Sequence, residues 1–117
     1  MEIIRRNDVD TIDRGGYLIK RLFTKVFKNP PQDVGFYEST IPKGEICKEQ
    51  WHKESYEAVY FLTPGVARIN GEEHKVGVGD LVIVDPGEKH EWRALDKDLV
   101  LFALRFPHLI EDKYTSE

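Results

Sequence analysis

Four side chains with nitrogen or oxygen donors are spaced so that they could bind a metal ion. Gln50 and His52 are two residues apart in a run of strand-forming residues, so alternation places them on the same face. Glu57 follows across a four-residue turn, and His90 opens a later strand after the tight turn 85–89. If the sheet closes so that this strand lies beside the others, the donors form an N2O2 set that suits a divalent metal.

Other kinds of catalytic site are excluded because their motifs are missing. The segment Gly77-Val78-Gly79 is neither a dinucleotide-binding fingerprint nor a phosphate-binding loop, and no Gly-x-Ser-x-Gly elbow is present. Cys47 is the only cysteine, and its flanking sequence does not resemble that of a catalytic thiol. One cysteine permits neither an intramolecular disulfide nor a cysteine-rich zinc site, so a reducing compartment is expected.

The donors need a framework of short strands. Turn signals that contain Gly, Pro or Asn recur at short intervals along the chain and predict such a framework. Eight runs rich in Val, Ile, Phe and Tyr lie between these signals: 17–23, 34–41, 46–51, 57–62, 66–70, 81–84, 90–95 and 99–106. Asn70-Gly71 predicts a hairpin between 66–70 and 72–76, because both central residues of a type I′ turn need positive φ. So many strands in a short chain predict an open sandwich or a small jelly-roll barrel. Helix is expected only near 8–12 and in the tail after Pro107.

Composition limits the class of protein. The 117 residues, of which 40% are hydrophobic and 32% charged, predict one globular domain with a modest core. We expect 1–33 to form N-terminal strands and a turn, 34–106 the barrel core and 107–117 a tail. The formal net charge of -4 argues against binding to nucleic-acid phosphates. No apolar stretch approaches the ~18 residues of a membrane span and no signal core is visible, so a soluble cytoplasmic protein is expected.

The first three donors stand in a segment that resembles the first motif of the cupin family. That motif runs Gly, five residues, His-x-His, three or four residues, Glu, six residues, Gly. Here Gly44 is followed after five residues by Gln50-x-His52. Glu57 comes after four more residues and Gly65 after a further seven. The sequence therefore has Gln50 in place of the first metal-binding histidine and one added residue before Gly65.

The fourth donor ends a segment that resembles the second cupin motif, which runs Gly, five residues, Pro-x-Gly-x-x-His, three residues, Asn. Gly79 is followed after five residues by the turn 85–89 and then by His90. Asp85 stands where the motif has Pro, and Ala94 stands where Asn is usual. Together the two segments cover about half of the chain.

The order Gln-x-His, Glu and a later His is also similar to the ligand set in the cupin domains of phosphomannose isomerases. The resemblance implies an all-β double-stranded β-helix, the jelly-roll barrel of cupins, with a small-molecule ligand in the barrel mouth. It also implies one divalent metal ion (Zn, Mn, Ni or Fe) bound by four residues, which are Gln50, His52, Glu57 and His90. Alternatively, Gln50 is an interior amide that does not bind the metal, since a carboxamide oxygen is a weaker donor than imidazole.

Three functions fit this set of residues. The first is an isomerase or epimerase of a sugar or sugar phosphate, in which the ion polarises a carbonyl and its neighbouring hydroxyl. It needs a group that carries a proton between carbons. Lys48, Glu54 and Glu88 are only loosely placed for this role, and Lys48 and Glu57 are the catalytic candidates. The second is a metal-dependent dioxygenase, and the third is a non-catalytic module that binds a small ligand. The harder oxygen of Gln50 favours isomerisation or binding over oxygen activation.

Alternation leaves the roles of several other residues open. Lys48 and Trp92 fall on the face of the expected ligands, and core filling is the preferred role for the tryptophan. Arg68, Arg93 and Arg105 offer charge for a phosphate, but alternation does not decide which of them faces the interior.

A homodimer is expected, because many short strands leave sheet edges open. A second copy would cover either strand 17–23 or the apolar run 99–106.

Overall fold

The computed structural model describes residues 1–24, 33–107 and 113–115, and short strands dominate these residues. The strands are β1 (Glu2–Ile4), β2 (Thr11–Asp13), β3 (Leu18–Lys20), β4 (Gly35–Ile41), β5 (Ile46–Trp51), β6 (Tyr56–Phe61), β7 (Gly65–Ile69), β8 (Glu72–Val76), β9 (Leu81–Val84), β10 (His90–Arg93), β11 (Leu99–Phe106) and β12 (Tyr114–Thr115). One short 3₁₀ helix, η1 (Arg6–Asp8), follows β1. In the described residues, no helix has the length and apolarity needed to cross a lipid bilayer.

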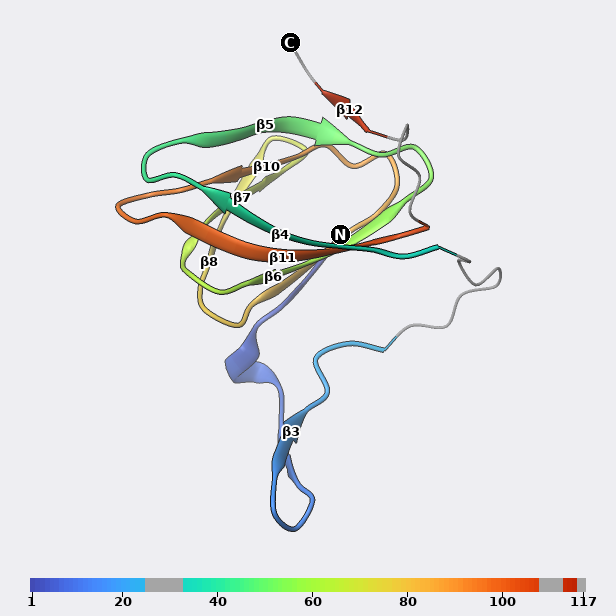
Figure 1. The fold of residues 1–117 in the computed structure, drawn as a ribbon, viewed down its shortest axis with the longest axis vertical. Helices are drawn as coiled ribbons and strands as arrows, with labels where there is room; N and C mark the ends of the chain where they lie inside the picture. The colour runs from blue at the N-terminus through green and yellow to red at the C-terminus, as the bar shows by residue number, and fades with distance from the viewer. Residues whose placement is uncertain (25–32, 108–112, 116–117) are drawn as a thin grey trace.

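Two five-stranded antiparallel sheets face each other and form a double-stranded β-helix (Figure 1). Their strand orders are β1-β9-β6-β11-β4 and β12-β5-β10-β7-β8. The expected jelly-roll architecture is confirmed. The expected closure into a barrel is wrong, because among the described strands no backbone ladder joins one sheet to the other.

The β7–β8 hairpin has the predicted turn. Ile69 pairs with Glu72, which leaves Asn70 and Gly71 as a two-residue loop with φ values of 49° and 84°. Asn and Gly are the residues that adopt this left-handed conformation most easily. The turn therefore sets the register of β7 and directs Ile69 into the core.

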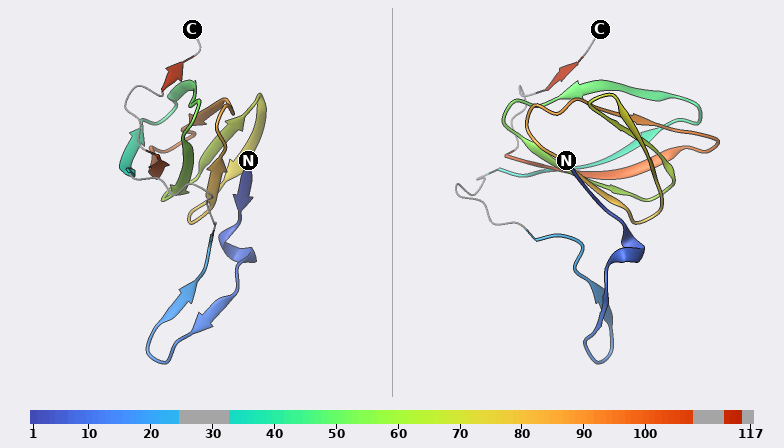
Figure 2. Two further views of the ribbon diagram at one scale, coloured as in Figure 1. Left: turned by 90° about the vertical axis from the view of Figure 1, so that its right-hand side faces the viewer. Right: turned by 180° about the vertical axis from the view of Figure 1, so that it is seen from behind.

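The N-terminal region differs from the prediction. The helical turn η1 begins two residues before the predicted range 8–12 and ends at Asp8, and Thr11–Asp13 forms a strand because Thr and Ile are β-branched. Of the predicted strand 17–23, only Leu18–Lys20 pairs, with β2. The β2–β3 hairpin projects away from the two sheets (Figure 2).

The tail also differs from the prediction where it is described. Residues 108–112, in which helix was expected, lie outside the described residues. Tyr114–Thr115 forms β12 and pairs with β5. The ring of Tyr114 stacks on Trp51 with a centroid distance of 5.9 Å, and this contact favours a strand over a helix.

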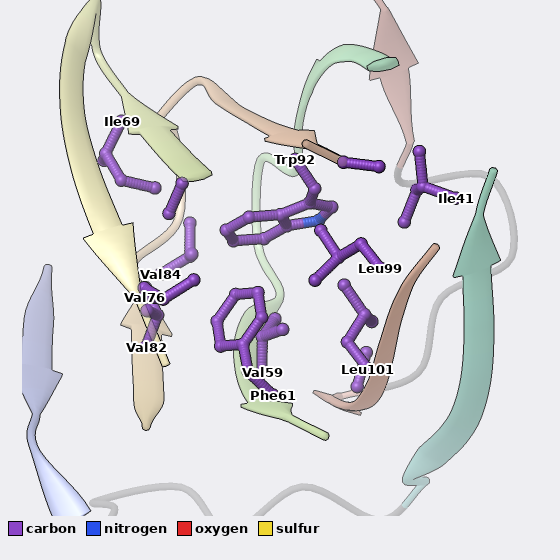
Figure 3. Close-up of a cluster of buried hydrophobic side chains, with 13 residues drawn as sticks. Ile41, Val59, Phe61, Ile69, Val76, Val82, Val84, Trp92, Leu99 and Leu101 are labelled. Atoms are coloured by element: carbon purple, nitrogen blue, oxygen red, sulfur yellow. The ribbon is translucent and has the colours of Figure 1, made fainter. Parts of the chain in front are cut away.

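The core lies between the sheets, around the indole ring of Trp92 (Figure 3). Phe61 packs edge-on against this ring at a centroid distance of 5.7 Å. Leu99 and Leu101 of β11 are fully buried in the same cluster. Each such side chain stabilises the fold by about 1.5–3 kcal/mol. The prediction that Trp92 fills the core is confirmed.

Asp80 joins the N-terminal segment to the turn between β8 and β9. Its carboxylate accepts hydrogen bonds from Arg5 Nη1 at 2.8 Å, from the Arg6 amide at 3.2 Å and from the Gly77 amide at 2.8 Å. Burial by itself would raise the pKa of Asp80, but these hydrogen bonds outweigh it and hold the pKa below its usual value. Gly79 has a φ of 82°, and a Cβ atom there would collide with the Arg6 side chain.

We expect Asp80→Asn to lower the free energy of unfolding at pH 7 by about 1–3 kcal/mol, because the amide loses the charge that strengthens these hydrogen bonds. Since the pKa is lowered in the folded state, the carboxylate stabilises the fold above its unfolded pKa of about 4, and this contribution is lost as the pH falls further. Urea unfolding should therefore show a smaller difference between the two proteins at pH 3 than at pH 7. Asp96→Asn, in an exposed turn, is the control. An equal difference at both pH values would contradict the interpretation.

Candidate metal centre

Three of the four predicted ligands meet in the interior of the sandwich. His52, Glu57 and His90 are buried, and one donor atom from each lies within 4.8 Å of the others. The Nε2–H of His52 donates a hydrogen bond to Glu57 Oε2 at 2.9 Å. The two imidazole rings lie 5.4 Å apart between centroids. Two imidazoles and one carboxylate form a donor set that suits a divalent cation.

The tight turn 85–89 helps to position both histidines. The amide of Gly87 donates a hydrogen bond of 2.6 Å to the carbonyl oxygen of His52, which ties the end of β5 to this turn. Gly87 has a φ of 84°, a conformation that glycine adopts at little cost. The turn then leads directly into β10, whose first residue is His90.

His90 has a nitrogen that is ready to bind a cation. Its Nδ1 lies 3.1 Å from the carbonyl oxygen of Glu88, and because a carbonyl only accepts, Nδ1 carries the proton. Nε2 therefore holds the lone pair; it is buried and has no hydrogen-bond partner in the described part of the chain. Burial lowers the pKa of His90 more than the nearby Glu57 carboxylate raises it, which favours the neutral imidazole that metals bind. An orphaned buried nitrogen in this place fits a metal ligand.

Glu57 is held in its ionised form. Burial by itself would raise the pKa of its carboxyl group, but the hydrogen bond from His52 and the electrostatic influence of His90, His52 and Arg105 outweigh burial, so the pKa is lowered. The carboxylate is 2% exposed. A buried ionised carboxylate is the form that binds a cation.

Gln50 lies beside this cluster. It is buried, and its Cα is the direct partner of His90 across the β5–β10 ladder. Its side chain also lines the same cavity as Glu57. This position agrees with the predicted fourth ligand, and ligation by its carboxamide oxygen stays a prediction.

A β-bulge separates Lys48 from the predicted ligands. Gln50 pairs with His90 and Cys47 pairs with Trp92, so β5 has one more residue than β10 between these pairs. The extra residue reverses the alternation, and Cys47 rather than Lys48 reaches the cavity wall. Lys48 is exposed, so the expectation that it shares the face of Gln50 is wrong.

The other acid and base candidates also lie apart from the cluster. Glu54 is exposed. The carboxylate of Glu88 accepts a hydrogen bond from the Asp85 amide at 2.8 Å, within the tight turn. Of the four residues considered for proton transfer, only Glu57 lines the cavity.

A cavity of about 540 Å³ opens between the sheets next to this cluster. Its wall is formed by Tyr37, Ser39, Thr40, Ile41, Pro42, Glu45, Ile46, Cys47, Gln50, Glu57, Trp92, Leu101, Ala103, Arg105 and Lys113. The two histidines are not part of the wall, so a ligand in the cavity meets the cluster on the side of Gln50 and Glu57. Burial raises the pKa of the Cys47 thiol, which agrees with the exclusion of thiol chemistry.

The structure also decides which arginine faces the interior. Arg105 lines the cavity and lies 3.6 Å from Glu57 Oε2 through its Nη2. Arg93 instead pairs with Glu73 at 3.1 Å, and Arg68 lies 3.8 Å from Glu91. Arg105 is the charged residue in the otherwise apolar run 99–106, but alternation in that run does not identify the face that it takes.

Comparison with known proteins agrees with this geometry. The model of the cupin domain matches residues 37–104, which is more than half of the chain and contains all four predicted ligands. The chain belongs to the cupin family. No curated protein sequence matches this cupin. The resemblance to phosphomannose isomerases is not confirmed by any of the comparisons.

Solved structures share the fold of this cupin at low sequence identity. A variant of Streptomyces PAC13 with uridine is 15% identical, with a TM-score of 0.63, over 97% of this chain and 89% of the other. A protein described as a sugar phosphate isomerase from Acidithiobacillus ferrooxidans is 22% identical, with a TM-score of 0.58, over 67% and 52% of the two chains. The DMSP lyase DddQ from Ruegeria pomeroyi is 20% identical, with a TM-score of 0.65, over 72% and 43%.

We expect His52→Ala and His90→Ala each to remove the metal from the purified protein, because each deletes one of few donors. Elemental analysis should find about one divalent ion per wild-type chain and background levels in both variants. His74→Ala, on β8, is the control for the loss of an imidazole elsewhere and should keep the metal. Circular dichroism checks that the variants fold. Full metal content in both folded variants would contradict the site.

Proposed function

We propose that this cupin binds one divalent metal ion through Gln50, His52, Glu57 and His90 and acts on a small carbohydrate-like molecule in the adjoining cavity. The observation that carries the proposal is the buried cluster of two histidines and a glutamate, in which His90 Nε2 has a lone pair and no partner in the described residues. When bound, the ion supplies a Lewis acid for the oxygen atoms of the ligand.

The cavity supports a ligand of this class. Its volume of about 540 Å³ lies within the roughly 300–1,000 Å³ that is usual for small-molecule sites. The wall offers hydroxyl groups from Tyr37, Ser39 and Thr40 and the amide of Gln50, which can donate to and accept from a polyol. Trp92 and Leu101 form an apolar part of the wall, which excludes water.

Two similar structures support a ligand that contains a sugar. Streptomyces PAC13 is described as a nucleoside dehydratase and has been solved with uridine, which contains ribose. The Acidithiobacillus protein is described as a sugar phosphate isomerase. A dehydration and an isomerisation both require polarised oxygen atoms, and neither consumes molecular oxygen.

A binding module without catalysis is the second candidate. Isomerisation requires a group that carries a proton between carbons, and Lys48 and Glu54 are exposed. Among the described residues of the wall, Glu57 is the buried titratable group, and as a metal ligand it would be a weak base. This arrangement suits recognition of a ligand as well as its conversion.

The partner proposed for the outer face of the first sheet is a second copy of this chain. An apolar groove there is lined by Lys20, Arg21, Leu22, Phe23, Phe36, Ala58, Tyr60, Leu81, Phe102 and Leu104. Phe36 is 67% exposed and packs on Phe102 at a centroid distance of 5.4 Å. The strand containing Phe102, β11, lies between β4 and β6, so it is no open edge, and only its outer side chains are left to be covered.

The proposed chemistry predicts metal-dependent turnover without oxygen. We expect a protein loaded with zinc or manganese to shift or exchange a carbon-bound proton in NMR spectra of sugar phosphates or nucleotide sugars. Glu57→Gln should abolish this signal, whereas Lys48→Ala should keep it, because Lys48 is exposed. Oxygen consumption by an iron-loaded protein, absent in Glu57→Gln, would overturn the proposal in favour of a dioxygenase. A ligand-induced thermal shift without turnover would assign the protein to the binding modules.

The proposed dimer predicts twice the mass of one chain in light scattering at micromolar concentration. Phe36→Asp should give the mass of one chain, because a charge in the interface destabilises association. Val78→Asp, at an exposed turn residue, is the matched control and should stay dimeric. A wild-type mass of one chain would rule the dimer out.

A further inference from the structure

Arg105 is a half-buried charge in the cavity that the metal cluster does not explain. Its Cα pairs with Glu57 on β6, and its side chain is 13% exposed. The guanidinium lies 3.6 Å from Glu57 Oε2, and its centre lies 5.3 Å from the ring centroid of Tyr37. Its Nε is buried and has no hydrogen-bond partner in the described part of the chain.

A guanidinium in such a place has unused binding capacity. It carries five N–H donors in a planar fork that matches a carboxylate or phosphate group. The contact with Glu57 is longer than a hydrogen bond, and the contact with Tyr37 uses the face of the ring rather than an acceptor atom. The donors that face the cavity are therefore available to a ligand.

The charges at the inner end of the cavity lead to the same conclusion. Glu57 is the buried carboxylate of the described wall, whereas Glu45 is exposed at its rim. A divalent ion bound to Glu57 would neutralise the carboxylate charge that faces Arg105. The cluster and the guanidinium together would then carry a net charge of about +2, which is costly in a buried site without an anion.

We propose that Arg105 binds an oxyanion group of the ligand, a carboxylate or a phosphate, beside Glu57. The inference rests on the proposed function, because it places the anion next to the metal ligands. It narrows the ligand class from carbohydrates in general to sugar acids or sugar phosphates. Arg68 and Arg93 do not line the cavity, so they are not expected to contribute.

Three matched ligands test the proposal: ribose, ribonate and ribose 5-phosphate share a polyol and differ in their anionic group. Calorimetric titration of the metal-free and manganese-loaded protein gives the dissociation constants. We expect ribonate or ribose 5-phosphate to bind about tenfold or more tightly than ribose, the ratio that one charged hydrogen-bonded contact supplies. The stronger of the two identifies the anion as carboxylate or phosphate.

Three variants locate the effect. Arg105→Gln should remove the preference for the anionic ligand, and Arg105→Lys, which keeps the charge and loses the fork, should keep only part of it. Arg93→Gln should bind as the wild type does. Thermal unfolding checks that Arg105→Gln folds; if it does not, the reduced preference of Arg105→Lys decides. Equal binding of all three ligands, or a preference in a folded Arg105 variant that is as strong as in the wild type, would overturn the proposal.

Metal content separates this proposal from the proposed function. If the protein binds no metal but its preference for the anion still depends on Arg105, the anion site stands and the metal function fails. If manganese binds and the preference does not depend on Arg105, the metal site stands and the anion site fails. If Arg105 only neutralised Glu57, its loss would change metal affinity but not the preference among the three ligands.

Discussion

An ionised carboxylate in the interior of the sandwich is the constraint on which the site depends. Removing a carboxylate from water destabilises a protein unless nearby charges and hydrogen bonds compensate it. Around Glu57 the compensation comes from both sheets, with His52 and His90 on one side and Arg105 on the other. These groups meet only if the β5–β10 and β6–β11 ladders are in register. The electrostatic compensation of Glu57 therefore depends on correct backbone pairing in both sheets.

Strand β11 shows how the fold combines a dry core with a polar site. Its inward residues Leu99, Leu101 and Ala103 belong to the core, and the next inward residue is Arg105. Its opposite face is apolar as well, since Leu104 and Phe106 pack in a second cluster. Core packing on the inner face and the ladders to β4 and β6 fix the strand that carries Arg105, and a fixed backbone is what a recognition group needs.

Local rules predicted the parts of this protein that depend on a few neighbouring residues. The Asn70-Gly71 turn followed from backbone sterics, and the approach of His52, Glu57 and His90 followed from motif spacing. The inward position of Arg105 could not be predicted, because a strand that is apolar on both faces has lost the period of two that identifies its inner side. The prediction for Lys48 was wrong for another reason. The bulge in β5 is defined by its pairing with β10, so the sequence of β5 alone does not reveal it.

The bulge in β5 divides that strand into two parts with different registers. Beyond it, Gln50 is aligned with His90, and before it, Cys47 is aligned with Trp92. The alignment at the donor end thus does not depend on a regular ladder along the whole strand. Natural variation in the residues before the bulge, such as Ile46 and Cys47, can reshape the cavity wall while the donors keep their places. One scaffold could in this way bind different small molecules while the arrangement of its donor residues stays the same.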